Sequence, residues 1–169
     1  STTLAANATS ITFNSIPSTF TDLEIRVSAR ASSAATDALV SVRFNGSTST
    51  IYSSTFLYGN GTSVGSARSS ASAEPYSGTV SSANATANTF GTAKFYIPNY
   101  GNSQYRLITG MAGAESATTS AATAWAWNSV SAGWFQSTTP VTSVTIGPFP
   151  SGSNFVSGST FYLYGISNT

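Results

Sequence analysis

Carboxylates are the side chains through which this chain could carry out acid–base chemistry. The sequence contains five of them: Asp22, Glu24, Asp37, Glu74 and Glu115. A glycosidase would need two of these groups facing each other across one cleft. Asp22 and Glu24 alternate with apolar residues, so they share one strand face, and three arginines lie on similar outward faces, namely Arg26, Arg30 and Arg43. This pattern favours a ladder of surface ion pairs over a catalytic pair.

Other reactive groups are absent from the sequence, which has no histidine and no cysteine. That absence excludes a Ser-His-Asp triad, a zinc site of the usual kind and thiolate chemistry. Calcium held by backbone carbonyls and Asp37 stays open, but no loop clusters Asp and Asn in the way such a site needs. We therefore expect no catalytic residue, no bound metal and no cofactor.

Aromatic residues are the better candidates for a binding role. Trp125 and Trp127 are two positions apart, so they point to the same side of a strand, and Trp134 follows in a turn-rich segment. Flat aromatic platforms are typical of sugar-binding surfaces, but large aromatics are used more often in cores and subunit interfaces. The candidate contact residues, for a subunit interface or a glycan, are Trp125, Trp127, Trp134, Tyr76 and Arg68. Trp134 is the preferred exposed contact, because Gly133 before it suggests a turn.

Composition limits the classes of partner. The chain has 169 residues, 40% of them hydrophobic and 12% aromatic, which predicts one folded domain over residues 1–169. Six basic and five acidic residues give a net charge of +1. Nucleic-acid binding needs a basic stripe that this chain cannot supply, so no nucleic-acid partner is expected. No apolar run approaches the roughly 20 residues of a membrane span, so membrane insertion is not expected either.

Hydrophobic periodicity predicts β-strands nearly everywhere. Apolar residues alternate with polar ones over residues 22–30 and again over 40–44, where the Asn45-Gly46 pair marks a turn. Other candidate strands cover residues 10–16, 51–58, 90–97, 105–112, 122–130, 141–146 and 160–166. Roughly eight to nine short strands separated by turns predict an all-β, antiparallel sandwich of jelly-roll type. Residues 62–88 are expected to form a long loop with one edge strand near 76–80.

The apolar positions of these strands predict the core. We expect it to contain Leu23, Ile25, Val27, Val40, Val42, Phe44, Ile97, Val144, Ile146, Phe161 and Leu163.

Four segments together resemble a known family. They are SITFNSIPSTFTDLEIRV at 10–27, RFNGSTSTIYSSTFLYGNG at 43–61, TANTFGTAKFYIPNYGN at 86–102 and FVSGSTFYLYGI at 155–166. In this order they resemble a β-sandwich domain of bacteriophage structural proteins, especially fibre or head-decoration proteins of marine and cyanobacterial phages. The resemblance implies a jelly-roll homotrimer on the exterior of a virion, with capsid or fibre-base proteins as partners. It transfers no catalytic residue.

Two functions from different classes follow as expectations. The first is a non-enzymatic virion surface module, a trimeric capsid decoration or fibre head that stabilises the particle, adheres to host surface glycans, or does both. The second is a carbohydrate-binding module of a secreted polysaccharide-degrading enzyme. An enzyme acting on polysaccharide is disfavoured by the few carboxylates. Residues 62–88 and 114–139 are the predicted contact regions, one at a subunit or capsid interface and the other facing outward towards glycan.

Overall fold

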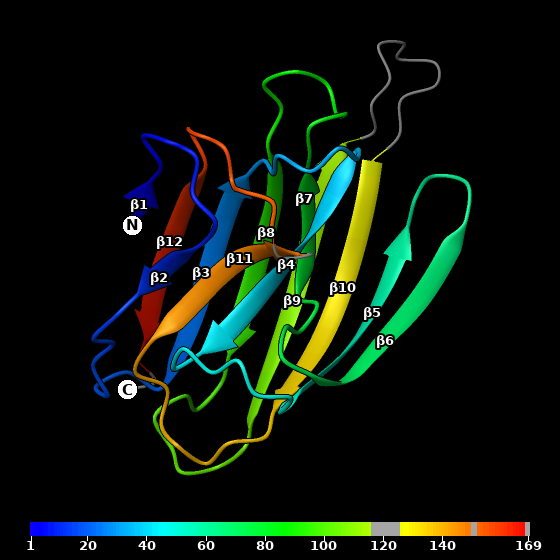
Figure 1. Cartoon of the computed structure of the whole chain (residues 1–169). Helices are drawn as coiled ribbons and strands as arrows, with labels where there is room; N and C mark the ends of the chain where they lie inside the picture. The colour runs from blue at the N-terminus through cyan, green and yellow to red at the C-terminus, as the bar shows by residue number, and fades with distance from the viewer. Residues whose placement is uncertain (116–125, 150–151, 168–169) are drawn as a thin grey trace.

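The computed structural model describes residues 1–115, 126–149 and 152–167, and this part of the chain contains strands and no helix (Figure 1). The strands are β1 (Thr2–Thr3), β2 (Ile11–Phe13), β3 (Asp22–Ala29), β4 (Asp37–Phe44), β5 (Tyr52–Gly59), β6 (Val64–Ser72), β7 (Gly78–Ser81), β8 (Gly91–Ile97), β9 (Arg106–Glu115), β10 (Ala126–Phe135), β11 (Val144–Phe149) and β12 (Thr160–Ile166). The all-β prediction is confirmed, although the strands outnumber those expected.

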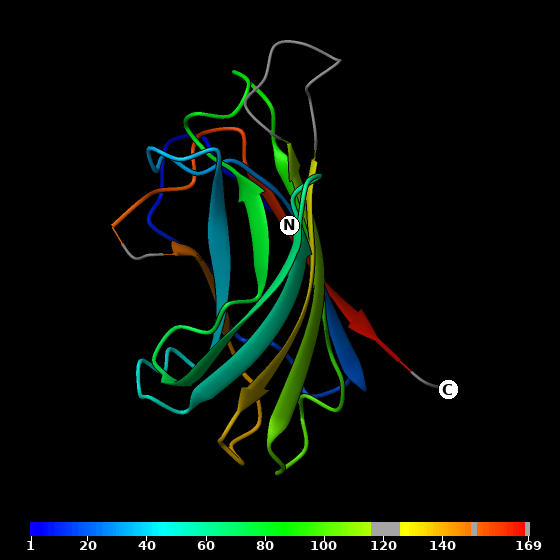
Figure 2. The ribbon, with the colours of Figure 1, turned by 90° about the vertical axis from the view of Figure 1, so that its right-hand side faces the viewer.

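Two antiparallel sheets pack face to face, as the two layers in Figure 2 show. The large sheet has the order β1-β12-β3-β8-β9-β10-β5-β6, and the small sheet has the order β2-β11-β4-β7. Without β5, β6, β9 and β10, two sheets of four strands remain, β1-β12-β3-β8 and β2-β11-β4-β7, which is the arrangement of a jelly roll. Two insertions, one between β4 and β7 and one between β8 and β11, therefore lengthen one sheet only.

The predicted core is confirmed for ten of its eleven residues, which are less than 9% exposed, while Leu163 is partly buried and packs against them. The core gains further rings that sequence alternation did not single out, including Phe95, Phe135 and Phe155. Burial of these side chains on both inner faces is the main force that holds the sheets together.

Small residues allow β7 to pack tightly against the large sheet, so that one side of the sandwich is closed. A Cβ atom added at Gly91 would lie 2.6 Å from the Ser81 amide nitrogen, and one added at Gly110 would lie 2.6 Å from the Ser77 carbonyl oxygen. Contacts this short exclude any larger residue without a shift of the backbone. The Ser131 hydroxyl donates to the same Ser77 carbonyl at 2.6 Å, so β10 and the start of β7 are tied together.

Two local predictions were wrong. Residues 62–88 contain a full strand, β6, which pairs with β5 across a turn that Asn60 closes by accepting hydrogen bonds from the amides of Thr62 and Ser63. Trp134 lies inside β10 and not in a turn, because it pairs with Ser53 on one side and Leu107 on the other. Gly133 beside it provides room, since a Cβ atom there would lie 2.7 Å from the Ile108 side chain.

Candidate functional site

The insertions create the part of the molecule where a site can form. We call β9, β10, β5 and β6 the extension; the small sheet ends at β7, and Figure 1 shows β5 and β6 reaching beyond it. Figure 2 shows the β5–β6 hairpin curving towards the side of the small sheet. The extension therefore has an outer face, away from the small sheet, and a concave inner face. The small sheet leaves the outer face uncovered, and on the inner side β7 packs against part of β9 and β10.

The outer face of the extension is apolar and exposed. Pairing places Leu57, Val130 and Met111 in one row across β5, β10 and β9. These side chains are 51%, 47% and 66% exposed. Apolar side chains in a contiguous group of this kind mark an interaction surface on a protein.

A second row on the outer face contains Trp134. It lies next to Leu107 of β9, and its ring packs edge to face on Tyr105 with centroids 5.6 Å apart. Trp134 is 38% exposed and Leu107 57%. Exposed Ala132 joins this row to the first. Trp134 is thus accessible, as expected, although a strand and not a turn presents it.

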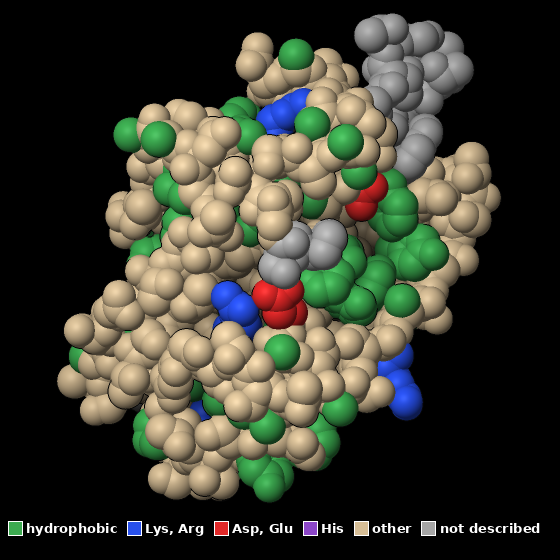
Figure 3. Space-filling view, viewed as in Figure 1, with side chains coloured by type: hydrophobic (Ala, Val, Ile, Leu, Met, Phe, Trp, Pro, Cys, Tyr) green, Lys and Arg blue, Asp and Glu red, His purple; other side chains and the backbone are tan. Residues whose placement is uncertain are grey.

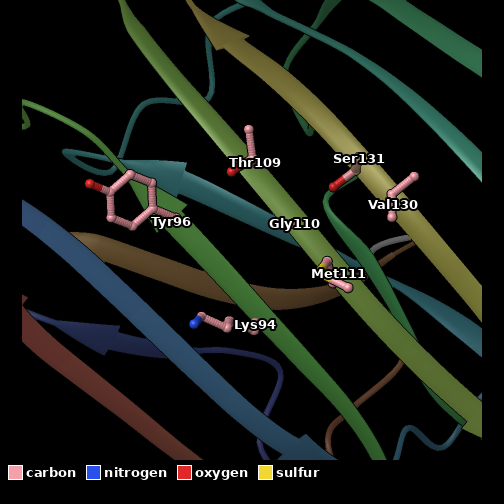
Figure 4. Close-up of a pocket in the computed structure, with 7 residues that line it drawn as sticks. All are labelled: Lys94, Tyr96, Thr109, Gly110, Met111, Val130 and Ser131. Carbon is pink, nitrogen blue, oxygen red and sulfur yellow. The ribbon is translucent and has the colours of Figure 1, made fainter.

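Shallow hollows lie between these rows and β8. One, of about 300 Å³, is lined by residues of three neighbouring strands, which Figure 4 shows: Lys94, Tyr96, Thr109, Gly110, Met111, Val130 and Ser131. A second hollow of about 550 Å³ shares Lys94, Met111 and Val130 with the first. Both are open towards solvent, so a broad partner surface fits them better than a small enclosed ligand.

Beyond Lys94 the outer face becomes polar. Glu24 accepts hydrogen bonds from Lys94 at 2.8 Å and from Arg26 at 2.7 Å, and these two contacts lower the pKa of Glu24. The predicted ion-pair ladder exists here in part. Asp22 is instead buried and accepts hydrogen bonds from the Tyr96 hydroxyl and the Asn99 amide, because β3 begins at Asp22, next to the turn that contains Asn99. The other two predicted members, Arg30 and Arg43, also lie elsewhere.

The inner face carries a chain of aromatic rings. Trp127 contacts Tyr58 with centroids 4.8 Å apart, and Tyr58 contacts Phe56 at 5.6 Å. Tyr76, just before β7, contacts Phe56 at 5.8 Å and Phe149 of β11 at 4.8 Å. All five rings are half-buried. Figure 3 shows hydrophobic side chains gathered in the hollow between the small sheet and the β5–β6 hairpin, with acidic side chains at its border.

The ring chain is held in position by its backbone neighbours. Gly65 pairs with Tyr58, and a Cβ atom on Gly65 would lie 2.5 Å from the tyrosine ring. The ring of Tyr58 is therefore confined between Gly65 and Trp127. Side chains fixed in this way on paired strands form a rigid surface that loses little entropy when a ligand binds.

The candidate contact residues divide between the two faces of the large sheet. Trp127 and Tyr76 belong to the inner ring chain, whereas Trp134 and Arg68 point outward. Arg68 pairs with Thr55 at the β6 border of the outer face. Trp125 lies outside the described residues. The two faces, and not the two sequence segments, therefore separate the candidate surfaces.

Sequence reasoning missed several residues of both faces: Phe56, Leu57, Tyr58, Leu107, Met111 and Val130. One signal was present, because β9 places Leu107 and Met111 out of phase with buried Ile108 and Ala112. A strand with large apolar residues in both phases indicates that both of its faces meet a partner.

The five carboxylates show no shared catalytic arrangement in their hydrogen bonds. Glu74 pairs with Arg43 at 3.1 Å, and Glu115 accepts hydrogen bonds from the Thr86 amide and the Thr89 hydroxyl. Asp37 has a pKa raised by burial, partly offset by a hydrogen bond from Thr36. Among the described residues, no group of three or more carboxylates could hold a metal ion, and no helix could span a membrane.

Comparison with known proteins adds no relative. No family model matches the chain, and neither a curated protein nor a solved structure is significantly similar to it.

Proposed function

We propose that this protein is a non-enzymatic structural module whose copies associate through the outer face of the extension. The observation that carries this proposal is the contiguous exposed apolar surface formed by Leu57, Val130, Met111, Leu107 and Trp134. Their exposed fractions correspond to on the order of 500 Å² of apolar surface, near the upper end for a monomer.

A second copy of the chain suits this surface for reasons of area and charge. A stable interface buries about 800 Å² on each partner, so the apolar rows would form its centre and polar residues around them its rim. In the described rows between Arg68 at one border and Lys94 at the other, no charged side chain interrupts the surface. Copies can meet there without burying like charges against each other.

The place of assembly is proposed as the exterior of a phage virion, with the homotrimer acting as a capsid decoration or fibre head. The resemblance of the four sequence segments and the jelly-roll arrangement support this proposal. Its partners would be sister subunits and capsid or fibre-base proteins. Cryo-electron microscopy of intact particles would test it, because density for this fold at threefold positions is expected on the particle surface and its absence from the particle would refute the assignment.

Self-association is tested by one substitution on the outer face. Met111→Glu places a charge at the centre of the apolar rows and should convert a trimer to a monomer at micromolar concentration, measured by sedimentation. Tyr162→Glu is the matched control, because Tyr162 is 38% exposed on β12, outside the extension, and its change should leave the trimer intact. A wild-type monomer at these concentrations, or equal effects of both changes, would contradict the proposal.

The second candidate function, a carbohydrate-binding module of a secreted enzyme, is favoured by the aromatic inner face. It predicts a catalytic domain encoded in the same reading frame. The full gene sequence distinguishes it from a virion protein.

A further inference from the structure

The hydroxyl groups of the ring chain on the inner face are unusual for a packing cluster. Buried tyrosine hydroxyls in this protein are bonded internally, as Tyr52 is to Phe44 and Tyr100 to Pro17. Within the described part of the chain, the hydroxyls of Tyr58 and Tyr76 have no hydrogen-bond partner. A half-buried phenol whose ring is packed and whose hydroxyl is free has one apolar and one polar group available to a ligand.

Packing alone accounts for only part of this arrangement. The rings do cover a section of the large sheet that the small sheet does not reach. Phenylalanine or leucine would provide that cover equally well, because burial stabilises apolar surface without regard to direction. Two free hydroxyls beside an indole fit a ligand that alternates apolar C–H faces with hydroxyl groups, which is the chemistry of a sugar ring.

We propose that the inner face of the extension binds a neutral glycan. One sugar ring packs against the ring pair formed by Trp127 and Tyr58, and the hydroxyls of Tyr58 and Tyr76 exchange hydrogen bonds with sugar hydroxyls. The inference deepens the proposed surface role, on which its biological meaning rests, by naming the ligand class and the residues that contact it.

Charge at the border of the hollow selects a neutral ligand over an acidic one. Glu74, two residues before Tyr76, is neutralised by Arg43 at 3.1 Å. Asp37 lies on the same face of β4 as Leu39, which pairs with Phe149, and no salt bridge of the described residues neutralises it. A sialylated or sulfated glycan would meet this carboxylate without a compensating cation.

The binding test uses the full chain and a defined set of probes. Cellohexaose, maltohexaose, xylohexaose and chitohexaose would be titrated by calorimetry and by NMR, together with a sulfated oligosaccharide. We expect at least one neutral probe to bind and to shift the resonances of Trp127 and Tyr58. Trp127→Ala should weaken this binding about tenfold or more. Trp134→Ala is the matched control on the opposite face of the same strand and should bind as the wild type does.

Two conservative variants keep the test independent of folding. Tyr58→Phe and Tyr76→Phe retain the rings and remove only the hydroxyls, so each should keep the melting temperature and weaken binding by about twofold to tenfold. If Trp127→Ala fails to fold, these two variants decide. Titration of the monomeric Met111→Glu protein should give wild-type affinity, which separates glycan binding from self-association.

Three results would overturn the inference. They are absence of binding to every neutral probe, preference for the sulfated probe, and binding that Trp134→Ala abolishes while Trp127→Ala and both Tyr→Phe changes leave it intact.

Discussion

Two buried arginines at opposite ends of the sandwich differ in how many hydrogen-bond acceptors replace the water that their charged guanidinium groups lose. Arg30 follows the end of β3 and is 9% exposed, and Arg106 begins β9 and is 1% exposed. Both strands pair antiparallel with β8, so they run in the same direction and these two positions lie at opposite ends. None of the salt bridges in the described structure includes either guanidinium.

Around the buried guanidinium of Arg30, backbone carbonyl oxygens take the place of water as hydrogen-bond acceptors. Its Nη1 donates to the carbonyls of Thr86 at 2.7 Å and Thr89 at 3.0 Å. Its Nη2 donates to those of Ala83 at 3.2 Å and Ala85 at 2.9 Å. These carbonyls all belong to the connection of residues 82–90 between β7 and β8. The arginine therefore works as the centre around which a strandless segment is ordered.

Arg106 has much less compensation. Its Nε donates to the Tyr100 carbonyl at 3.1 Å, while Nη1 and Nη2 are buried without a partner among the described residues. Burial consequently lowers the pKa of Arg106. We infer that burial of a cation is not in itself stabilising or destabilising. The sign depends on how many acceptors the surrounding backbone brings to it.

Removal of Arg30 should have the largest effect. Arg30→Met removes the guanidinium that donates to four buried or partly buried carbonyls, and we expect the free energy of unfolding to fall by about 3 kcal/mol. Urea denaturation measures the loss, and hydrogen exchange should show amides of residues 82–90 exchanging faster. Arg30→Lys should recover only part of the stability, because an ammonium cannot reach all four acceptors at once. An unchanged unfolding midpoint in Arg30→Met would show that the connection is ordered by other contacts.

The same substitution at the other end should have the opposite sign. Arg106→Met removes an undersatisfied buried charge and keeps most of the apolar volume, so the free energy of unfolding should rise by about 1–2 kcal/mol. The measurement is again urea denaturation at neutral pH. Arg106→Lys retains the charge and serves as control; it should not stabilise. A loss of more than about 1 kcal/mol in Arg106→Met would mean that the guanidinium is satisfied in solution after all.

Glu115 tests whether the connection held by Arg30 has a second anchor. Its carboxylate accepts hydrogen bonds from the Thr86 amide at 2.6 Å and the Thr89 hydroxyl at 2.9 Å. Glu115→Gln keeps one carbonyl oxygen as acceptor, so we expect a loss of only about 1 kcal/mol. Combined with Arg30→Met the losses should differ from their sum, because both residues order the same segment. If the two losses are strictly additive in a double-mutant cycle, Arg30 and Glu115 stabilise the connection independently, which would contradict this expectation.

The fold could be predicted where alternation carries strong contrast. In β3 and β4, large apolar residues alternate with charged ones, so their inner positions were assigned correctly. In β6 the half-buried positions are Gly65, Ala67, Ser69 and Ser72, and the exposed ones include Ser66, Ser70 and Ala71. Residues this similar in size and polarity show no hydrophobic alternation, so the sequence does not indicate a strand here. The strand forms because it pairs with β5.

The candidate site was only partly accessible to sequence reasoning, for a related reason. Trp127 and Trp134 are separated by an odd number of positions, so within one strand they must face opposite sides. Gly133 suggested a turn and concealed that strand. The position of the extension depends on β10 pairing with β5, which lies far away in the sequence. Which arginines are buried also depends on contacts between segments far apart in the sequence, such as Arg30 with residues 83–89, and could not be inferred from their count.

Asp37 tests whether the effect of a buried charge on stability depends on its compensating partners, because it is a partly buried anion without a cation partner among the described residues. Burial raises its pKa above that of the unfolded chain. A raised carboxyl pKa means that its contribution to stability is greatest at low pH and is lost as pH rises through the folded pKa. Asp37→Asn should therefore increase stability at pH 7 by less than about 1 kcal/mol and leave it unchanged near pH 3.

Glu24 is the control for Asp37, with the opposite sign. Its hydrogen bond with Lys94, and then that with Arg26, lower its pKa, so its contribution is present at neutral pH and lost as pH falls through the folded pKa. Glu24→Gln should destabilise at pH 7 and have less effect in acid. Urea midpoints for both variants at pH 7 and pH 3 measure how the stability of each changes with pH. If Asp37→Asn lowers stability at pH 7, the carboxylate has a stabilising partner. The number of hydrogen-bond partners seen in the structure would then not explain how every buried charge affects stability.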